Sequence, residues 1–378
     1  MNMKISDEGL AFLAEAGMFI DERIRPNADI FDKERMLPRS LLQAMARQGY
    51  FGLNIPKEEG GSGRNALEYG EFTALLGRAC SSVRTLLTVH CSLVAESIAR
   101  WGTQWQRREW LPGLLSADTI CAFAISEPAH GSDIKGIATH YRKRGSNYII
   151  SGTKKWISFG AIADRYLLFA KCEGKMSAFF VDRAATGVHV KSIDNLLSQR
   201  ASHLAQITFD EVTVNESQLL GTEGGGELLL MSALDQGRFS VAWGGMGLAK
   251  EALVQMIGYA KSREQFGSRL ADFQLIQGLI GDGTTAVHAS RAMCERAASH
   301  RMSHSCDAVY ETTIAKYFAA STAVKVAEQA LQVHGANGLS GDFSIERLFR
   351  DAKALEIIEG SSQMQQLMIS SYAMTVEK

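Results

Sequence analysis

The sequence is short of proline: it has five, and none lies beyond Pro128. Proline interrupts helix interiors and central strands, so the rest of the chain can form long unbroken elements. No run of about 18 apolar residues is present, which excludes a membrane-spanning helix. The six cysteines have no CxxC spacing and predict neither a disulfide framework nor a zinc site. We therefore expect reduced, buried cysteines.

An excess of charge of one sign is missing as well. Forty Lys and Arg residues against 41 Asp and Glu residues give a net charge of −1. A nucleic-acid-binding protein would carry a basic surface, so we expect no such partner. The first 21 residues contain acidic side chains and do not have the layout of a signal peptide. These features predict a globular cytoplasmic protein, with two or three domains at 378 residues.

Hydrophobic periodicity divides the chain into three parts. Residues 1–118 have apolar residues at helical spacing. Residues 119–222 contain short β-rich runs, with a turn at Gly152, at the spacing of a sandwich or barrel. Residues 223–378 suit an antiparallel helical bundle, with amphipathic segments at 227–262, 273–302, 307–334 and 361–373. We predict an α+β protein in the order helical domain, β-domain, helical bundle.

Three polar segments are candidates for chemistry. The segment 126–133 (SEPAHGSD) lies where helices give way to strands, and it could offer donors to a ring edge or a phosphate, or form an ordinary capped turn. Trp156, beside Ser158, could stack on a flat heterocycle or belong to the core. Glu359 follows an apolar stretch and precedes a helix. If buried it would have a raised pKa and act as a general base, and otherwise it would interact with the helix dipole.

Two further patterns favour structure over chemistry. The segment 61–66 (GSGRNA) fits a loose dinucleotide-binding pattern, but its flanks are helical, so we expect a surface loop. His300 and His304 have a spacing that can hold zinc, but the segment is polar and no glutamate lies between them. We expect a solvated helix end there and no metal.

Taken together, the motifs resemble the acyl-CoA dehydrogenase family, and the resemblance covers essentially the whole chain. It implies a helical domain, a β-barrel or sandwich domain and a C-terminal four-helix bundle. Its most specific segments are 126–133 (SEPAHGSD), 155–158 (KWIS), 263–267 (REQFG), 332–338 (QVHGANG), 350–353 (RDAK) and 359–363 (EGSSQ).

The resemblance implies roles for individual residues. Glu359 matches the catalytic base, and Arg238 matches an arginine near it. Ser132 and Gly360 match substrate-binding positions. The positions that match FAD-binding residues are Phe123, Ser126, Gly131, Ser132, Trp156, Ser158, Arg263, Phe266, Gln274, Gln332, Gly335, Ala336, Ser361 and Gln363. In the family, the residues that match the six from Arg263 to Ala336 hold the FAD of a neighbouring subunit.

The resemblance also implies cofactor, partners and chemistry. Each subunit would bind one FAD, usually in a homotetramer, with a homodimer as the alternative. The substrate would be an acyl thioester of CoA or acyl carrier protein, and an electron-transfer flavoprotein or dioxygen would accept the electrons. Glu359 would remove a proton while a hydride passes to the flavin, and preorganised donors would stabilise the enolate oxygen.

A narrower resemblance concerns the substrate. The segments 70–73 (GEFT), 80–88 (CSSVRTLLT), 240–247 (SVAWGGMG) and 355–362 (LEIIEGSS) are similar to dehydrogenases of polyketide extender-unit pathways. That subgroup oxidises the C3 aldehyde of a glycerate-derived acyl-carrier-protein thioester to a carboxylate, giving hydroxymalonyl and methoxymalonyl units. The chain departs from the general family at His130, Phe159 and the segment 199–204 (QRASHL), which puts ordinary fatty acyl-CoA binding in doubt. The alternative is α,β-dehydrogenation of a short or branched acyl-CoA.

Overall fold

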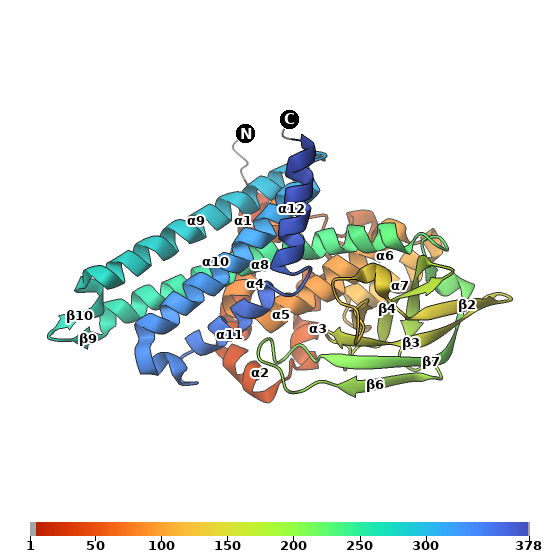
Figure 1. The fold of residues 1–378 in the computed structure, drawn as a ribbon, viewed down its shortest axis with the longest axis horizontal. Coiled ribbons are helices and arrows are strands. Elements are labelled where there is room, and N and C mark those ends of the chain that lie inside the picture. The colour runs from red at the N-terminus through yellow and green to blue at the C-terminus, as the bar shows by residue number, and fades with distance from the viewer. Residues whose placement is uncertain (1–4, 377–378) are drawn as a thin grey trace.

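A computed structural model describes residues 5–376 of the chain, and its N-terminal third is helical as predicted (Figure 1). Its α-helices are α1 (Asp7–Arg23), α2 (Ala28–Glu34), α3 (Arg39–Arg47), α4 (Ala66–Ala79), α5 (Ser81–Leu86), α6 (Glu96–Trp101) and α7 (Gln104–Leu115). The segment η4 (Leu87–Ala95), between α5 and α6, is a π-helix, a form that occurs mostly at functional sites. Residues 61–65 form the predicted surface loop, and Ala66 begins α4.

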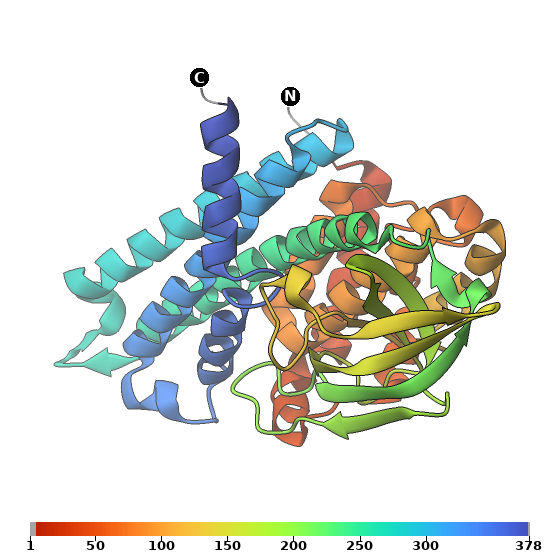
Figure 2. The same cartoon turned by 45° about the vertical axis from the view of Figure 1, so that its right-hand side comes forward.

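The middle of the chain forms one eight-stranded sheet that folds over its own core (Figure 2). Along the sheet the order is β6-β7-β3-β2-β4-β5-β8, and β1 pairs with β4. Leu167 and Phe169 of β4 pack toward the helices, whereas Tyr166 and Leu168 belong to a separate core with β3 and β7. The strands are β1 (Cys121–Ala124), β2 (His140–Arg144), β3 (Asn147–Ile157), β4 (Arg165–Cys172), β5 (Lys175–Asp182), β6 (Val188–Ser192), β7 (Ala205–Asn215) and β8 (Leu219–Leu220).

The predicted turn at Gly152 is wrong. β3 continues through this residue, and its pairing with β7 shifts register there. Gly152 has φ +152, and a Cβ on it would lie 2.6 Å from the Cα of Thr139. The glycine therefore marks a bulge and a close backbone approach, which have the same sequence signature as a turn.

The C-terminal part is a bundle of long helices, as its amphipathic segments predict and the lack of proline permits. Its α-helices are α8 (Gly226–Ser262), α9 (Gln274–Met302), α10 (Ala308–His334), α11 (Ile345–Leu355) and α12 (Ser362–Val376). A short hairpin, β9 (Glu264–Gln265) and β10 (Ser268–Arg269), connects α8 to α9 at the far end of the molecule from the sheet (Figure 1). This architecture confirms the predicted α+β class.

Glycines let α4 and α8 approach closely. A Cβ on Gly77 would lie 2.8 Å from the Gly244 carbonyl carbon, and one on Gly247 would lie 2.9 Å from that of Ala74. Any larger residue would force the helices apart, so the glycine-rich segment 240–247 is a packing surface. It holds the middle of α8 against the helices that contribute to the candidate site.

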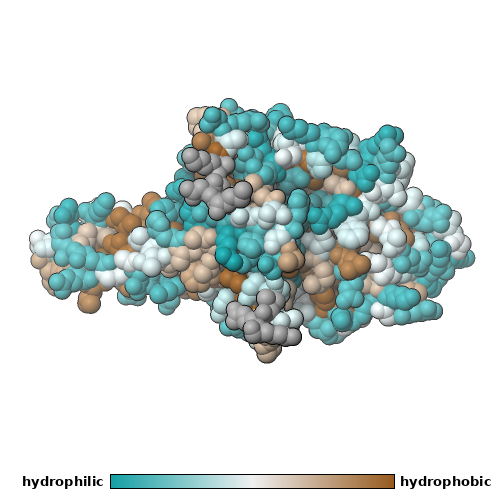
Figure 3. All heavy atoms as spheres, turned by 90° about the horizontal axis from the view of Figure 1, so that it is seen from above, coloured by the Kyte–Doolittle hydropathy of each residue, from teal (hydrophilic) through white to brown (hydrophobic). Residues whose placement is uncertain are grey.

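The face of the molecule drawn in Figure 3 is mostly polar, and apolar side chains are seen on the projecting arm of the bundle as well as in smaller patches elsewhere. Phe266 is 96% exposed and Leu275 is 88% exposed at this end. Within residues 5–376, no helix has both the length and the apolar character needed to cross a membrane.

Candidate active site

Glu359 lies in a tight turn between α11 and α12. Both Glu359 (φ 54) and Gly360 (φ 86) have left-handed backbone conformations, which are costly for a residue with a side chain. Lys316 Nζ donates to the Gly360 carbonyl at 2.6 Å, and Gln365 Nε2 donates to the carbonyls of Glu359 and Gly360 at 3.2 Å each. These bonds hold the strained turn, and Ser361, not Glu359, caps α12 by accepting from Met364 N at 3.3 Å.

The carboxylate of Glu359 is turned inward toward α8. Its Oε2 is inaccessible to solvent and has no hydrogen-bond partner among the described residues. A Cβ on Gly237 would lie 2.8 Å from the Glu359 carboxylate carbon and 2.9 Å from Leu93 Cδ2. Only glycine at position 237 allows the carboxylate to lie against the helix backbone.

Burial raises the pKa of Glu359 to about 7, and the cations Arg238, Lys316 and Arg84 oppose that rise. The group can therefore accept a proton near neutral pH. Arg238 was predicted to lie near the base, and it does: it is buried, and its Nε and Nη1 have no protein partner in the described chain. Between the two sequence interpretations of Glu359, the geometry favours a buried general base.

The sequence analysis missed Arg84 and Lys316 as site residues. Arg84 is 1% exposed, and its Nη1 donates to Thr88 Oγ1 at 3.1 Å. The Thr88 hydroxyl in turn lies 2.7 Å from Ser240 Oγ. Within residues 5–376, its Nη2 has no partner. Burial lowers the pKa of Arg84 to about 10, although Glu359 and Asp351 raise it. The available signal was an arginine inside an otherwise apolar helical stretch.

The predicted loop 126–133 and the end of β3 lie side by side. Lys155 N donates to the Ser126 carbonyl at 2.9 Å. The loop rests on a buried ion pair in which Lys154 Nζ is 2.9 Å from Glu127 Oε1. Trp156 is 53% exposed, so its interpretation as a core residue is wrong. Phe123 is buried in β1 beneath this face, Ser126 and Ser158 are half-buried, and Gly131 and Ser132 are exposed.

Ser361, which is half-buried, and Gln363, which is exposed, lie at the start of α12 directly after Glu359. The remaining six predicted cofactor residues lie at the opposite end of the bundle. Arg263, Phe266 and Gln274 surround the β9–β10 hairpin and are exposed, as are Gln332 in the last turn of α10 and Gly335 and Ala336 after it. At 1.5 Å per residue, α8 separates Arg238 from Arg263 by about 37 Å. One copy of the chain therefore does not bring the two sets of residues together.

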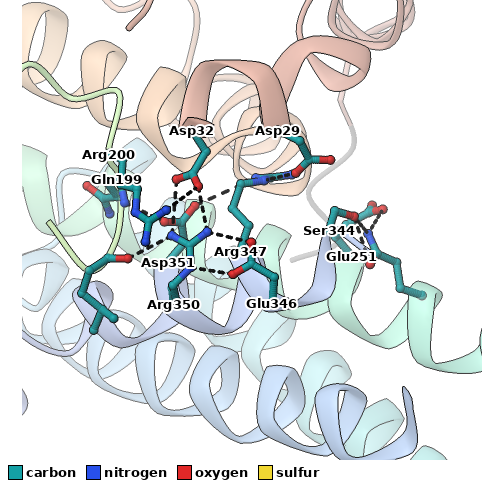
Figure 4. Close-up of polar contacts among 12 residues, drawn as sticks. Asp29, Asp32, Gln199, Arg200, Glu251, Ser344, Glu346, Arg347, Arg350 and Asp351 are labelled. Carbon is teal, nitrogen blue, oxygen red and sulfur yellow. Dashed lines mark hydrogen bonds and ion pairs between the residues drawn. The ribbon is translucent and has the colours of Figure 1, made fainter. Parts of the chain in front are cut away.

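A polar network fixes the helix that leads to Glu359 (Figure 4). Arg350 of α11 lies 2.7 Å from Asp32 of α2, and Arg347 lies 2.7 Å from Asp29. Asp351 Oδ1 accepts from Gln199 N at 2.7 Å, in the loop before β7. The segment 350–353 (RDAK) thus ties α11 to the N-terminal helices and to the β-domain.

The two histidines of the possible zinc spacing have other surroundings. His300 Nδ1 lies 3.1 Å from Ser305 Oγ, and His304 lines a surface pocket. Across the described chain, no three His, Cys, Asp or Glu side chains lie close enough together to hold a metal ion.

Comparison with known proteins identifies the class. Family models match the acyl-CoA dehydrogenase N-terminal domain over residues 6–118, the middle domain over 122–212 and the C-terminal domain over 224–374. An acyl-CoA dehydrogenase of Bacillus subtilis is 34% identical over 376 residues, which cover 98% of this chain and 99% of that protein. The chain belongs to the acyl-CoA dehydrogenase family. It is a flavin oxidoreductase that acts on acyl thioesters, with FAD as its cofactor.

Two solved structures are informative about the acyl group. A glutaryl-CoA dehydrogenase in complex with glutaryl-CoA has a TM-score of 0.95 and 29% identity, covering 100% of this chain and 97% of that one. FkbI, described as acting in biosynthesis of the methoxymalonyl extender unit of the polyketide FK520, has a TM-score of 0.87 and 32% identity. That match covers 98% of this chain and all of FkbI.

The residues at the end of β3 and in the loop 126–133 fit an FAD. The exposed indole of Trp156 has a left-handed backbone (φ 64), and such strain often marks a ligand site. The half-buried Ser126 and Ser158 flank it and can hydrogen-bond to a polar ring edge. An aromatic face with hydroxyls beside it suits a flat heterocycle with polar edges.

Proposed function

We propose that the enzyme oxidises the C3 aldehyde of a glycerate-derived three-carbon acyl group, carried on acyl carrier protein, to a carboxylate. The product would be a hydroxymalonyl thioester for a polyketide extender unit. The observation that carries the proposal is the excess of buried positive charge around Glu359. The 32% identity to FkbI supports the same substrate class.

The charge balance disfavours an alkyl substrate. Arg84, Arg238 and Lys316 all act on Glu359, so three cations face one carboxylate. Further acids act on these cations, but each is paired elsewhere. Asp351, which acts on Arg84, is 3.9 Å from Arg347 and bonded to Gln199 N. Asp235, which acts on Arg238, is 2.7 Å from Arg301. Glu356, which acts on Lys316, is 2.6 Å from Lys353. A buried guanidinium is costly unless it is paired, and an alkyl chain would leave Arg84 Nη2 and Arg238 without partners. A hydrated aldehyde, and then a carboxylate, would supply the oxygens that these donors need.

Each residue then has a defined task. The hydrate of the aldehyde loses a hydride from C3 and a proton from one hydroxyl, which converts C3 to a carboxylic acid. Ionisation of this acid then releases a second proton and leaves the carboxylate. Glu359 takes the hydroxyl proton, while Arg84 and Arg238 bind the oxygens as negative charge develops. FAD, when bound, accepts the hydride. Lys316 holds the turn and keeps Glu359 ionised.

The cofactor site is proposed to be shared between copies of the chain. Phe123, Ser126, Gly131, Ser132, Trp156, Ser158, Ser361 and Gln363 would bind the flavin beside Glu359, with Ser132 and Gly360 also contacting substrate. The residues at the far end of the bundle would bind the FAD of a second copy, because about 37 Å separates them from Arg238. This supports a homotetramer or homodimer. An electron-transfer flavoprotein is the proposed electron acceptor.

Flavin bleaching by different thioesters tests the substrate. The holoenzyme is mixed with the carrier-bound three-carbon aldehyde, with butyryl-CoA or isobutyryl-CoA, and with glutaryl-CoA. We expect rapid bleaching by the carrier-bound aldehyde only. Bleaching by butyryl-CoA or isobutyryl-CoA alone would overturn the proposal and favour conventional α,β-dehydrogenation. Bleaching by glutaryl-CoA alone would support the cationic chamber that Arg84, Arg238 and Lys316 form around Glu359, and would overturn the three-carbon substrate.

A substitution at Arg84 tests the role of the chamber. Arg84→Gln should retain FAD and slow bleaching by the carrier-bound aldehyde at least about 30-fold, the cost of breaking a buried charged contact. Arg108→Gln, an exposed cation on α7, is the matched control and should leave the rate unchanged. A wild-type rate in Arg84→Gln would contradict the charge argument.

A further inference from the structure

A second polar pocket lies beside the catalytic chamber. It has a volume of about 390 Å³, opens to solvent, and is lined by residues of α4, α6, α8 and the α9–α10 connection, including Tyr69, Glu96, Gln236 and His304. A narrower recess continues from it between α6 and α8, lined by Ser92, Glu96 and Gln236 among others. Nothing in the proposed reaction uses this pocket.

A single layer of residues separates the pocket from the catalytic carboxylate. On α8, Gly237 lies against Glu359 and the adjacent Gln236 lines the pocket. On the π-helix, Leu93 meets the same point beside Gly237, and the adjacent Ser92 lines the recess. Thus α8 and the π-helix each place one residue, Gly237 or Leu93, on the side of Glu359 and the preceding residue on the side of the pocket.

The pocket side of this wall is polar, whereas Gly237 and Leu93 on the side of Glu359 are apolar. The Ser92 hydroxyl is hydrogen-bonded to the Tyr69 hydroxyl, which lines the pocket. Buried oxygens of two lining residues, Asn54 Oδ1 and Asp235 Oδ1, lack partners within residues 5–376. A roomy cavity with unpartnered polar atoms can hold water.

Glu96 is the acid at this junction. It lies one helical turn after Ser92 and accepts from Asn54 Nδ2 at 2.5 Å. Burial raises its pKa to about 7, against the opposing effects of Arg301 and Arg100, while Asp235 raises it further. Tyr69 and Cys91 are the other titratable groups that it influences. The pKa values of Glu96 and Glu359 are therefore matched, so a proton can pass between them with little free-energy change.

We propose that Glu96 receives the proton that Glu359 has removed from the substrate and releases it to solvent through this pocket. An O–H bond breaks on Glu359 and one forms on Glu96, with water passing the proton across the wall beside Gly237, which has no side chain, and nothing is oxidised or reduced. Such an exit would be needed if bound thioester and flavin close the chamber during turnover. The proposal rests on Glu359 being the base and does not depend on which acyl group is oxidised.

Proton release measured against flavin bleaching tests the proposal. In a single turnover of holoenzyme at pH 8, with whichever thioester bleaches the flavin, a pH-indicator dye should report release in step with bleaching. Glu96→Gln should leave the bleaching rate within about twofold and delay proton release at least tenfold. Glu96→Asp should restore release, and Glu58→Gln, an exposed acid in the N-terminal part, should behave as wild type.

A measurement without substrate gives an independent readout. Infrared spectra of the holoenzyme titrated across pH 7 should lose one protonated-carboxyl band in Glu96→Gln and keep that of Glu359. Tyr69→Phe, which keeps the ring, should delay proton release if Glu96→Gln does not fold. Proton release at the wild-type rate in whichever of these two variants folds would overturn the proposal. Loss of bleaching in Glu359→Gln, with release still coupled in Glu96→Gln, would overturn this inference and leave Glu359 as the base.

Discussion

The contact between Glu359 and α8 can be tested by adding one methyl group at Gly237. In Gly237→Ala the new Cβ would lie 2.8 Å from the Glu359 carboxylate carbon, whereas ordinary contact begins at 3.4 Å. The carboxylate, or Leu93 at 2.9 Å, must therefore move by about half an ångström or more. Misplacing a catalytic group by 1 Å can cost about 10²-fold in rate, so we expect a loss of kcat of roughly 10- to 100-fold.

The same helix supplies the control. Gly258 of α8 has nothing within 4 Å of its Cβ position, so Gly258→Ala should leave kcat unchanged and stabilise the helix by up to about 1 kcal/mol. The assay is steady-state turnover, normalised to bound flavin measured by its absorbance. A Gly237→Ala enzyme with full flavin content and wild-type kcat would refute the claim that the carboxylate is held against the helix backbone.

Four further predictions follow from charges and distances in the site. Glu359→Gln should keep FAD and lose about 10²–10⁴-fold in turnover, measured with any active thioester. With the pKa of Glu359 at about 7, kcat/KM should rise with pH through 7. Lys316→Met removes a cation that lowers this pKa, so the rise in kcat/KM should move to a higher pH by roughly one unit. Glu127 is held below its usual pKa, at about 2, by bonds from Lys154, Thr139 and Ala138 that outweigh burial. Its stabilising contribution should therefore be lost as pH falls from about 4.5 toward 2 in thermal unfolding, and Glu127→Gln should abolish that dependence. Mixed oligomers of Glu359→Gln and Phe266→Ala chains should regain turnover if sites are shared, whereas mixtures no better than the parents would exclude sharing.

The long elements were predictable because their signals are local. Four C-terminal segments were predicted within one residue at their starts, since amphipathic periodicity without proline suffices for a helix. The turn at Gly152 was wrongly predicted, because a bulge needs the same residue and only its contact with Thr139 distinguishes the two. The π-helix η4 leaves no periodic signature of its own, so it was read as part of an ordinary helix.

The chamber was predictable only in part because its residues come from distant segments. Glu359 and Arg238 carried motif signals, but Arg84 and Lys316 lie on α5 and α10 and reach the carboxylate only through tertiary packing. Glu96 was equally inconspicuous, because its raised pKa comes from burial. Sequence patterns locate a catalytic turn, whereas the charge that surrounds it depends on packing between helices.

The place of Arg84 in the chamber nevertheless depends on one other position in the sequence, Gly244. A Cβ on Gly244 would lie 2.6 Å from Arg84 Cδ and 3.0 Å from its Cγ, so any larger residue at 244 displaces the arginine. The same glycine allows Gly77 of α4 to approach α8, which closes the chamber on that side. If alanine or a larger residue stood at this point of α8, an arginine at position 84 could not lie where Arg84 lies here. If the proposed substrate is correct, we expect arginine at position 84 and glycine at position 244 to occur together in enzymes that bind an oxygenated acyl group.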